Sequence, residues 1–430
     1  MKCLADRFNP PLIIKAVGFL SPDLVVKKSI SPKCFGFCYK KEKNTFLSPK
    51  YLTFGFNCGI ILFERKVLEM NGAYFAEPLP LTEGKIDQTT FFEELIDATS
   101  KFEVYKEKIK DSKLESSWFM PILQQKEALA SSMLEGTQAT LDGVLSNQVI
   151  PNEKDKNIKE VSNYCEATVQ GYDYLKRRDF SDDFFFDMHK TLMNGNVRKP
   201  KLIGKYRIEQ NFIGKNDPMH SITFIPPKPE LVPDLMKNLI EYINNPDDKF
   251  RPLVRTAIIH AQFETIHPFM DGNGRVGRML IPMYLFAQKQ IDLPCFFISE
   301  ALERDKILYY NLLNDIRYKG NWNEWIKFFL IAVTRQCEKY IDIISKINVL
   351  YEKDLSIARE LARSSSIVDV MNTLFRYPII TAKQVAEMTN IPPTSVSRYL
   401  SLLADNKILV TDNKSRNRTY YYYEFLDILR

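Results

Sequence analysis

Apolar residues repeat at three- and four-residue spacing through most of residues 90–345, and this period constrains the fold more than any other feature. The segments FFEELIDATSKFEVYKEKI, EALASSMLEG, KEVSNYCEATVQGYDYL and LMKNLIEYINN all carry it, as amphipathic helices do. One interruption is clear: YRIEQNFIG and SITFIPP are short, β-branched and aromatic, with GKNDPMH between them, which is typical of a hairpin. We therefore expect a mainly α protein, a helical bundle with one small β-hairpin.

Length and composition narrow the class of protein. A chain of 430 residues is longer than a single hydrophobic core usually organises, so two or three domains are expected. Nothing in the sequence approaches the roughly 20 apolar residues that span a bilayer, and no secretory signal is evident at the N-terminus. The seven cysteines are irregularly spaced and odd in number, which fits a reducing compartment. We expect a cytoplasmic protein with no membrane partner.

Positive charge is concentrated at the N-terminal end. Residues 1–69 hold 12 Lys/Arg against 5 Asp/Glu, whereas the whole chain has a net charge of +6. The remainder is close to neutral, so average charge does not argue for nucleic-acid binding by the main body. We interpret residues 1–69 as an N-terminal extension, or as upstream translation with Met70 as the start. Cys34 and Cys38 are spaced like half a metal site, but without a second pair we prefer unrelated thiols.

The segment HPFMDGNGRVGR, residues 267–278, joins two apolar helical runs, LVRTAIIHAQFETI and VGRMLIPMYLFAQ. The first helix should end before Pro268, because a residue preceding proline avoids helical geometry. Gly272 and Gly274 permit positive φ and a close approach of the backbone to a ligand. The N–H groups at the start of the second helix would form an anion site.

Four side chains of this segment suit phosphate chemistry. Arg275 and Arg278 are three residues apart, on one face of a helical turn, and can hold phosphate oxygens with forked donors. Asp271 is suited to Mg²⁺. His267 titrates near neutral pH and could take a proton from a hydroxyl. Together these are the parts of a phosphoryl- or nucleotidyl-transfer site.

Residues 267–278 match the Fic family signature HPFx(D/E)GNGRxxR at every fixed position, and the chain from about residue 70 to 345 resembles that family. The resemblance implies a protein adenylyltransferase, in which His267 deprotonates a target Tyr, Ser or Thr hydroxyl that attacks the α-phosphate of ATP. It also implies that Asp271 coordinates Mg²⁺, Arg275 contacts the β-phosphate and Arg278 the γ-phosphate. The ATP-binding residues implied are Gly272, Asn273, Gly274, Arg275, Val276, Gly277, Arg278 and Tyr310.

Two further segments agree with this resemblance. Thr223, Phe224 and Ile225 in the expected hairpin resemble the family flap, which pairs with the backbone of the target as an added strand. Tyr309 and Tyr310, in KILYYNLL, occupy the place where relatives line the adenine pocket, and Tyr310 is the preferred candidate.

The run SSMLEG, residues 131–136, resembles the inhibitory motif (S/T)xxxE(G/N) of the family, with Ser131, Glu135 and Gly136 at the fixed positions. The resemblance implies that Glu135 pairs with Arg278. A carboxylate on that guanidinium would keep it from the γ-phosphate, so the chain would carry its own brake. The alternative is that Glu135 faces solvent on an amphipathic helix.

Three other histidines have no evident chemical context. His260, Glu264 and His267 share helical spacing, but the HExxH arrangement is absent and a metal site is disfavoured. We expect His260 to be packed, His189 to pack or bond within the bundle, and His220 to be exposed.

Residues 366–430 predict three helices followed by strands, with Thr381 as an N-cap, and resemble a winged helix-turn-helix domain. Its recognition helix would begin with Thr394, Ser395, Ser397 and Arg398, and Lys414, Arg416 and Arg418 would form the wing tip, a distribution suited to DNA. Protein docking is the alternative for such a domain.

The sequence therefore predicts an AMP-transferring enzyme that uses ATP and Mg²⁺ and acts on a protein. Removal of AMP at the same site, and a nucleotide-sensing DNA-binding regulator, are the alternatives. A homodimer and DNA contact through the winged helix are further partners left open. The expected organisation is an extension at 1–69, a helical region at 70–175 with an inhibitory helix near 125–140, a catalytic core at 176–345, a linker helix at 346–365 and a winged helix at 366–430.

Overall fold

The computed structural model describes residues 73–147, 149, 155–195, 202–217, 220–246, 249–293, 295–412, 414 and 416–430, and for 215–217 and 220–223 only the backbone. The chain divides into one unit over Met1–Phe63 and another over Glu64–Arg430, and every described residue belongs to the second. The predictions made for residues 1–69, including Cys34 and Cys38, lie outside the described residues. So does the prediction for the His220 side chain.

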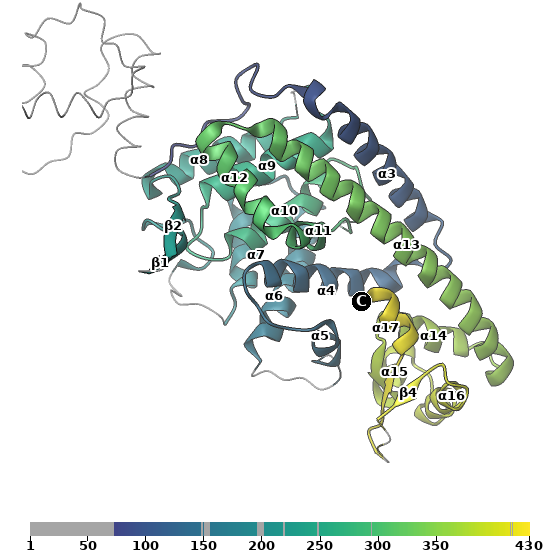
Figure 1. Cartoon of the computed structure of the whole chain (residues 1–430). Coiled ribbons are helices and arrows are strands. Elements are labelled where there is room, and N and C mark those ends of the chain that lie inside the picture. The colour runs from purple at the N-terminus through teal and green to yellow at the C-terminus, as the bar shows by residue number, and fades with distance from the viewer. Residues whose placement is uncertain are drawn as a thin grey trace, which may run out of the picture. The chain divides into compact units, whose positions relative to one another are not determined.

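The described unit is built around two helices, α9 (Pro252–Ile266) and α10 (Asn273–Ala287), which pack on each other. Every residue of α9 from Leu253 to Ile266 is buried, as expected of a helix surrounded by other elements. The indole of Trp325 donates a 2.9 Å hydrogen bond to the carbonyl of Ala257 and ties α9 to the long helix α13 (Trp322–Ala362). Figure 1 shows α13 running beside α3 (Phe92–Lys110), and the two pack closely.

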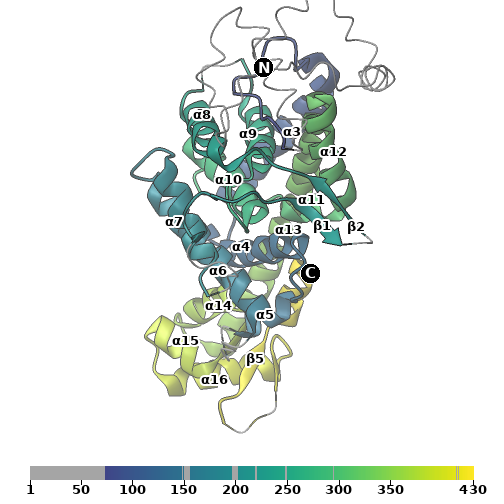
Figure 2. The same cartoon turned by 90° about the vertical axis from the view of Figure 1, so that its left-hand side faces the viewer.

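The remaining helices of the core surround this pair (Figures 1 and 2), and the expected mainly α fold is confirmed. The inhibitory motif lies at the C-terminal end of α4, which packs against α6, α10 and α11. These elements are α4 (Ser116–Leu134), α5 (Leu141–Asn147), α6 (Lys156–Leu175), α7 (Asp182–Leu192), α8 (Val232–Asn244), α11 (Ser299–Arg304) and α12 (Lys306–Lys319), with short 3₁₀ turns η4 (Gln88–Phe91) and η6 (Pro229–Leu231).

The predicted hairpin is present, but its strands lie closer to the turn than expected. β1 (Ile213–Asp217) pairs antiparallel with β2 (His220–Phe224), and residues 206–212 form no strand. The reason is that this segment is tied to the loop after α9. The N–H of Arg207 donates to the carbonyl of Pro268 at 2.9 Å, and the amide of Asn211 donates to the carbonyl of Phe269 at 2.8 Å.

The C-terminal part alternates helices and short strands. Thr381 is the N-cap of α15 and forms a capping box with Gln384, as predicted. A strand before α15 and a final helix were not expected. The elements are α14 (Ile367–Arg376), β3 (Ile379–Thr381), α15 (Ala382–Thr389), α16 (Pro393–Asp405), β4 (Val410–Thr411), β5 (Thr419–Tyr421) and α17 (Tyr423–Leu429), and the three strands form one sheet in the order β3-β5-β4.

This C-terminal part is joined to the core by continuous structure. The segment expected as a separate linker helix, 346–365, is largely the last part of α13, which runs unbroken through residue 345 to Ala362. α14 packs against both α13 and α4. Within the described residues, no helix has both the length and the apolar character that crossing a bilayer requires.

Candidate active site

The loop between α9 and α10 is shaped by residues in left-handed conformations at its two ends. His267 caps α9 with φ 51° and ψ 60°, and Gly272 precedes α10 with φ 76°. A left-handed backbone costs a histidine energy that glycine avoids, so the surrounding contacts must hold His267 in place. A Cβ on Gly272 would also lie 2.9 Å from the sulfur of Met193. The predicted helix end before Pro268 is confirmed.

Asn273 closes the loop on itself. Its side-chain oxygen accepts from the N–H of Phe269, and its amide donates to the carbonyl of the same residue, both at 2.8 Å. The side chain is thus committed to loop structure, and only its backbone N–H faces the start of the helix. The prediction that Asn273 takes part in binding phosphate stays a prediction, and these two bonds leave its backbone N–H, and not its side chain, for that role.

His189 supports the same loop from α7. Its ring stacks on Phe269 with centroids 3.9 Å apart, Nδ1 accepts from the N–H of Gly204 at 2.9 Å, and Nε2 lies 3.1 Å from the carbonyl of Asp271. Because Nδ1 accepts, the proton is on Nε2, which donates to Asp271. Burial lowers the pKa of His189 to about 4, so this arrangement holds at neutral pH. Its contact with the loop was not predicted.

Arg207 is the second support that the sequence did not reveal. Its buried guanidinium donates from Nε to the carbonyl of His267 at 2.9 Å and from Nη2 to the carbonyl of Pro227 at 2.5 Å. A weaker contact reaches the carbonyl of Ile266 at 3.4 Å. Carbonyl groups at a helix end need such donors, and these hold the backbone of His267 in its left-handed conformation.

The imidazole of His267 lies at the mouth of the loop with its side chain 17% exposed. Nδ1 is turned inward, 3.9 Å from a carboxylate oxygen of Glu264 on the preceding turn of α9. Burial, together with the nearby guanidinium of Arg317, lowers the pKa of His267 to about 3. The imidazole is therefore neutral at physiological pH, as a base that accepts a proton must be.

The first turn of α10 has the uncapped helix start from which an anion site was predicted. No side chain caps this helix, so the N–H groups of residues 273–275 remain available for a ligand. Arg275 is buried beside this turn, with its guanidinium 3.8 Å from Glu160 and 3.9 Å from Asp271. These are long contacts, so Arg275 can turn to a bound anion. Asp271 presents a side chain that is 65% exposed.

Arg278 is engaged by the end of α4. Its guanidinium is buried and donates from Nε to the hydroxyl of Ser131 at 2.8 Å, and from Nη2 to the carbonyl of Ser131 at 2.9 Å and to Glu135 at 2.6 Å. Burial alone would raise the pKa of Glu135, but the Arg278 charge outweighs it and holds the pKa below its usual value. The carboxylate is thus ionised, and the pairing of Glu135 with Arg278 is present.

Glu135 also occupies the anion site itself. A Cβ on Gly274 would overlap Oε1 of Glu135, so the carboxylate lies directly against the first turn of α10. Its oxygens stand where an anionic oxygen of a ligand would approach these N–H groups. Gly274 lacks a side chain where the backbone must come close to that anion.

Two residues of α12 hold the end of α4. Lys306 donates to the carbonyl of Leu134 at 2.8 Å, and the hydroxyl of Tyr310 donates to the same carbonyl at 3.3 Å. Tyr310 is half-buried and thus lies beside the inhibitory motif. Tyr309 is core, with its hydroxyl 3.0 Å from Nε2 of His260, whose Nδ1 lies 2.9 Å from the carbonyl of Gly277. His260 is packed, as expected.

Some residues predicted to bind ATP or the target have buried side chains, and their roles stay predictions. Val276 is fully buried, and Gly277 lies against Glu264 and Phe263, because that face of α10 packs on α9. The Phe224 side chain is buried, with the guanidinium of Arg317 3.9 Å from the centre of its ring. In the flap, the carbonyl of Ile225 accepts from the N–H of Tyr74 at 2.9 Å. The side chain of Thr223 is not described.

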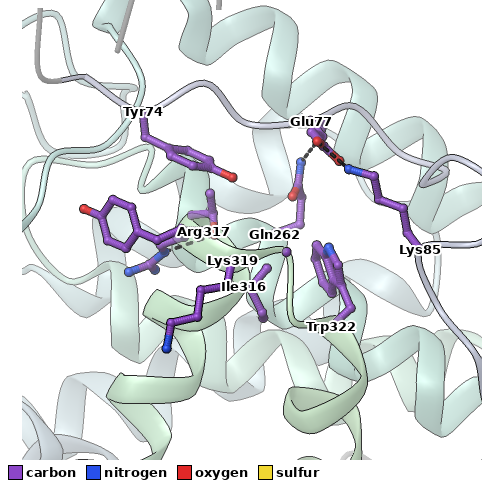
Figure 3. A pocket seen from close by; sticks show the side chains of 11 residues that line it. Tyr74, Glu77, Lys85, Gln262, Ile316, Arg317, Lys319 and Trp322 are labelled. Atoms are coloured by element: carbon purple, nitrogen blue, oxygen red, sulfur yellow. Dashed lines mark hydrogen bonds and ion pairs between the residues drawn. The ribbon is translucent and has the colours of Figure 1, made fainter. Parts of the chain in front are cut away.

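A cavity of about 270 Å³ lies between the segment that holds Tyr74, Glu77 and Lys85 and the C-terminal ends of α9 and α12. Figure 3 shows Tyr74 and Arg317 on one side and Glu77 and Lys85 on the other, with Gln262 between them. No residue of the 267–278 loop lines it. It is therefore separate from the loop, where Glu135 fills the anion position.

Most residues of the predicted DNA-binding face are exposed. Thr394, Ser397 and Arg398 are exposed at the start of α16, and Ser395 is half-buried. Between β4 and β5, Lys414 and Arg416 are exposed, and Arg418 donates to the carbonyl of Lys414 at 3.1 Å.

The fold and the site define a helical protein in which a carboxylate of its own chain lies against the start of α10 and pairs with Arg278. Comparison with known families gives matches to the Fic/DOC family over residues 179–285 and to the Fic/DOC family N-terminal region over residues 92–173. A probable protein adenylyltransferase of Aquifex aeolicus is 30% identical over 251 residues, which are 52% of this chain and 73% of that protein.

Two further relatives extend the comparison. A protein adenylyltransferase of Caenorhabditis elegans is 31% identical over 158 residues, which are 35% of this chain and 28% of the nematode protein. The crystal structure of a Fic family protein from Desulfovibrio desulfuricans G20 is similar in fold, with a TM-score of 0.50 at 19% identity over 81% of this chain and 98% of that chain. The chain described here belongs to the Fic/DOC family.

Proposed function

We propose that this chain is a protein adenylyltransferase, which transfers AMP from ATP to a hydroxyl of a protein and releases pyrophosphate. The observation that carries the proposal is the neutral imidazole of His267 beside an uncapped helix start that already holds an anion, the Glu135 carboxylate. The names of the Aquifex and nematode relatives support the same activity.

Each step of the proposed reaction is assigned to particular residues. His267 takes the proton of the target hydroxyl as its oxygen bonds to the α-phosphorus, and the bond from that phosphorus to pyrophosphate breaks. The N–H groups of Asn273, Gly274 and Arg275 bind phosphate oxygens through the helix start. Arg275 binds the β-phosphate and Arg278 the γ-phosphate, as forked donors to anionic oxygens.

Asp271 fits a magnesium ion that arrives with the nucleotide. Within the described residues no group of three acidic, His or Cys side chains could hold a metal alone, and Mg²⁺ in nucleotide sites needs only one or two carboxylates beside the phosphates. The Asp271 carboxylate is exposed, and its Oδ1 accepts from the N–H of Gly272 at 2.7 Å, which orients it toward the anion site. When bound, Mg²⁺ neutralises charge on the phosphates.

The Glu135 carboxylate is the brake on this activity. While it holds Arg278, the guanidinium cannot bind the γ-phosphate, and the carboxylate repels a phosphate from the N–H groups beside Gly274. ATP can reach the productive position only after the end of α4 releases Arg278. Because Ser131 and Glu135 belong to the same chain as the loop, the inhibition is intramolecular.

The test compares the parent chain with Glu135→Gly, incubated with α-labelled ATP, Mg²⁺ and a cell lysate. Label on protein, at least tenfold more with Glu135→Gly, is the expected result, and Glu135→Gly combined with His267→Ala should show none. Label released from previously modified protein would instead indicate removal of AMP. Neither incorporation nor release by any variant would refute the proposed function.

The C-terminal part suggests a second candidate function, DNA binding. Asp412 accepts from the backbone N–H groups of Lys414 and Thr419 and forms a 3.0 Å ion pair with the Lys414 ammonium group, and Arg416 near the same turn is exposed. Those cations, with Arg398 on α16, could contact phosphates around a helix placed in a groove. Retention of duplex DNA that weakens with salt and is lost on Lys414→Glu with Arg416→Glu would support it; equal retention by the variant would refute it.

A further inference from the structure

The side chains of Glu264 and His267 face each other at the C-terminal end of α9, at a distance too long for a hydrogen bond between them. Within the described residues, Nδ1 of His267 and Oε1 of Glu264 are both buried atoms without a hydrogen bond. The other carboxylate oxygen of Glu264 lies 3.9 Å from Nδ1. A buried polar atom without a hydrogen bond is unfavourable, so the unpaired Nδ1 beside this carboxylate indicates an interaction that shortens in a working state.

The fold makes specific room for this carboxylate. A Cβ on Gly277 would overlap Oε1 of Glu264, so α10 passes directly over the carboxyl group. Gly277 has no positive φ, and its lack of a side chain is therefore explained by this close approach. The conformation of the chain around Glu264 is held by Arg317, which donates to the Glu264 carbonyl at 3.0 Å.

Charged and titratable groups from several elements surround Glu264, among them the phenols of Tyr309 and Tyr310 on α12. Arg278 on α10 and Arg317 on α12 favour its ionised form, whereas Glu135 after α4 opposes it, and His267 faces it on α9. Burial is the largest influence and raises the pKa of Glu264 to about 7. The carboxyl group can therefore be either neutral or charged near physiological pH.

We propose that Glu264 is a positioning residue for the adenylyl transfer: its carboxylate holds the proton of His267 on Nδ1, so that Nε2 faces the target hydroxyl as the base. The inference rests on the proposed function of this site and assigns a role to a residue outside the 267–278 segment. When Nε2 takes the proton of the hydroxyl, the imidazolium formed lies beside the Glu264 charge, which stabilises it. The hydroxyl oxygen forms the bond to the α-phosphorus, and pyrophosphate leaves with the electrons of the broken bond.

Two substitutions separate the parts of this role. Glu264→Gln keeps an oxygen that can accept from Nδ1 but removes the charge, and Glu264→Met of similar length removes both. Asp354→Asn is the matched control, because Asp354 is a buried carboxylate on α13 that accepts from the hydroxyl of Tyr422 at 2.6 Å and has no contact with the loop.

The first measurement needs no activity. In protein labelled with ¹⁵N-histidine, the His267 signals, assigned by their loss in His267→Gln, should show the proton on Nδ1 in the parent, in Glu264→Gln and in Asp354→Asn. In Glu264→Met the proton should move wholly or partly to Nε2. A Glu264→Met protein whose His267 keeps the parent pattern would overturn the proposal.

The second measurement is kinetic and uses the Glu135→Gly background with α-labelled ATP. Glu264→Gln should lower kcat by about tenfold, part of the roughly 10²–10⁴ that general base catalysis supplies, with KM for ATP within twofold. Glu264→Met should lower it further, and Asp354→Asn should have no effect. Activity of the Glu135→Gly parent should rise with pH as Glu264 ionises, with a midpoint below pH 7 because the Glu135 charge that raises the pKa of Glu264 is absent, and this rise should be absent in Glu264→Gln.

The outcomes distinguish this inference from the proposed function. Transfer by the parent with an unchanged kcat and pH profile in Glu264→Gln would overturn the role of Glu264 alone. No transfer by any variant, with the proton still moving in Glu264→Met, would refute adenylyl transfer and leave the pairing of Glu264 with His267 supported. If Glu264→Met does not fold, the pH profile of Glu264→Gln decides.

Discussion

Arg278 and Glu135 are joined by a 2.6 Å ion pair in which one partner is fixed and the other is exposed: the Arg278 side chain is 1% exposed and that of Glu135 is 36% exposed. Arg278 has two further hydrogen bonds to Ser131. Opening of the pair must therefore come from Glu135 and the end of α4, while the guanidinium keeps its place beside the loop. The proposed brake can open without dismantling the site.

Ser131→Ala should release the brake in part. It removes the 2.8 Å bond from Nε of Arg278 but leaves the Glu135 pair. A hydrogen bond to a charged group contributes about 1.5–3 kcal/mol at most, so we expect labelling with α-labelled ATP to rise by roughly 3- to 10-fold, below the level of Glu135→Gly.

Ser132→Ala is the control for that prediction. Ser132 is the next residue of α4 and is equally buried, yet its hydroxyl has no hydrogen-bond partner among the described residues. Its removal should leave labelling unchanged and stability unchanged or higher. Equal labelling by both variants would show that the Ser131 bond does not contribute to the brake.

Gly274→Ala should inactivate the chain without unfolding it. The new methyl group would overlap the position of the Glu135 carboxylate, which is also the position proposed for phosphate. Gly274 has no positive φ, and alanine is favoured over glycine in a helix by up to about 1 kcal/mol, so Tm should stay the same or rise.

The Gly274→Ala methyl group could act by displacing the Glu135 carboxylate or by blocking phosphate, and the Glu135→Gly background separates these two effects. There, Gly274→Ala should lower labelling by at least tenfold and raise KM for ATP, although no carboxylate remains to be displaced. Undiminished labelling by this double variant would show that phosphate does not approach the first turn of α10.

Arg207→Lys should lower both stability and activity. One ammonium group cannot replace the planar donors that reach the carbonyls of His267, Pro227 and Ile266, and unpaired buried carbonyls cost about 1–3 kcal/mol each. We expect a loss of roughly 2–4 kcal/mol in the free energy of unfolding by urea, and a fall in kcat of at least tenfold in the Glu135→Gly background.

Arg255→Lys is the matched control for Arg207→Lys. Arg255 is also buried and donates to the hydroxyl of Tyr284 at 2.8 Å and the carbonyl of Tyr242 at 2.5 Å, but it does not reach the loop. It should cost similar stability and leave kcat within twofold. If both variants lose the same share of kcat, the effect of Arg207 is on global stability alone.

Glu127→Gln should change how stability depends on pH. Glu127 on α4 accepts from the hydroxyl and from the N–H of Ser299, and burial raises its pKa to about 7 from 4.5. The folded state therefore holds a proton that the unfolded state releases between these values, so this contribution to stability is full below about pH 4.5 and is lost as pH rises through 7.

The parent should accordingly lose stability relative to Glu127→Gln between pH 5 and 8, by roughly 2–3 kcal/mol. Thermal unfolding of both proteins at pH 5, 6.5 and 8 measures this. If the Tm values of the parent and of Glu127→Gln change in parallel across that range, Glu127 is ionised in the folded state.

The 267–278 segment shows how far prediction from the sequence can reach. The helix end before Pro268 and the anion-binding start of α10 follow from backbone preferences within a few residues. The contact of Ser131 and Glu135 with Arg278 was also implied, because residues 131–136 resemble a family motif, although Arg278 is more than 140 residues away.

The residues that hold the 267–278 loop in place, Arg207 and His189, were not predicted from the sequence. Arg207 lay in a segment that looked like a strand, and His189 in a helix with no evident chemistry, yet both bind backbone atoms of the loop, 60 and 82 residues away. Such contacts use carbonyl groups, which every residue has, and so leave no pattern of side chains to recognise. The continuity of α13 past residue 345 also depended on packing, here against α3 and α14.

The sequence by itself determined the helical class of the fold and the helix end before Pro268, because glycine, proline and residues at short spacing act through local geometry, and the pairing of Glu135 with Arg278 was implied by resemblance to a family motif. Only the tertiary structure decided that the Asn273 side chain shapes the loop, that Phe224 and Val276 belong to the core, and that Glu264 meets His267 in the space left by Gly277. Those outcomes depend on which surfaces of separate elements come together, and packing is set by the whole chain.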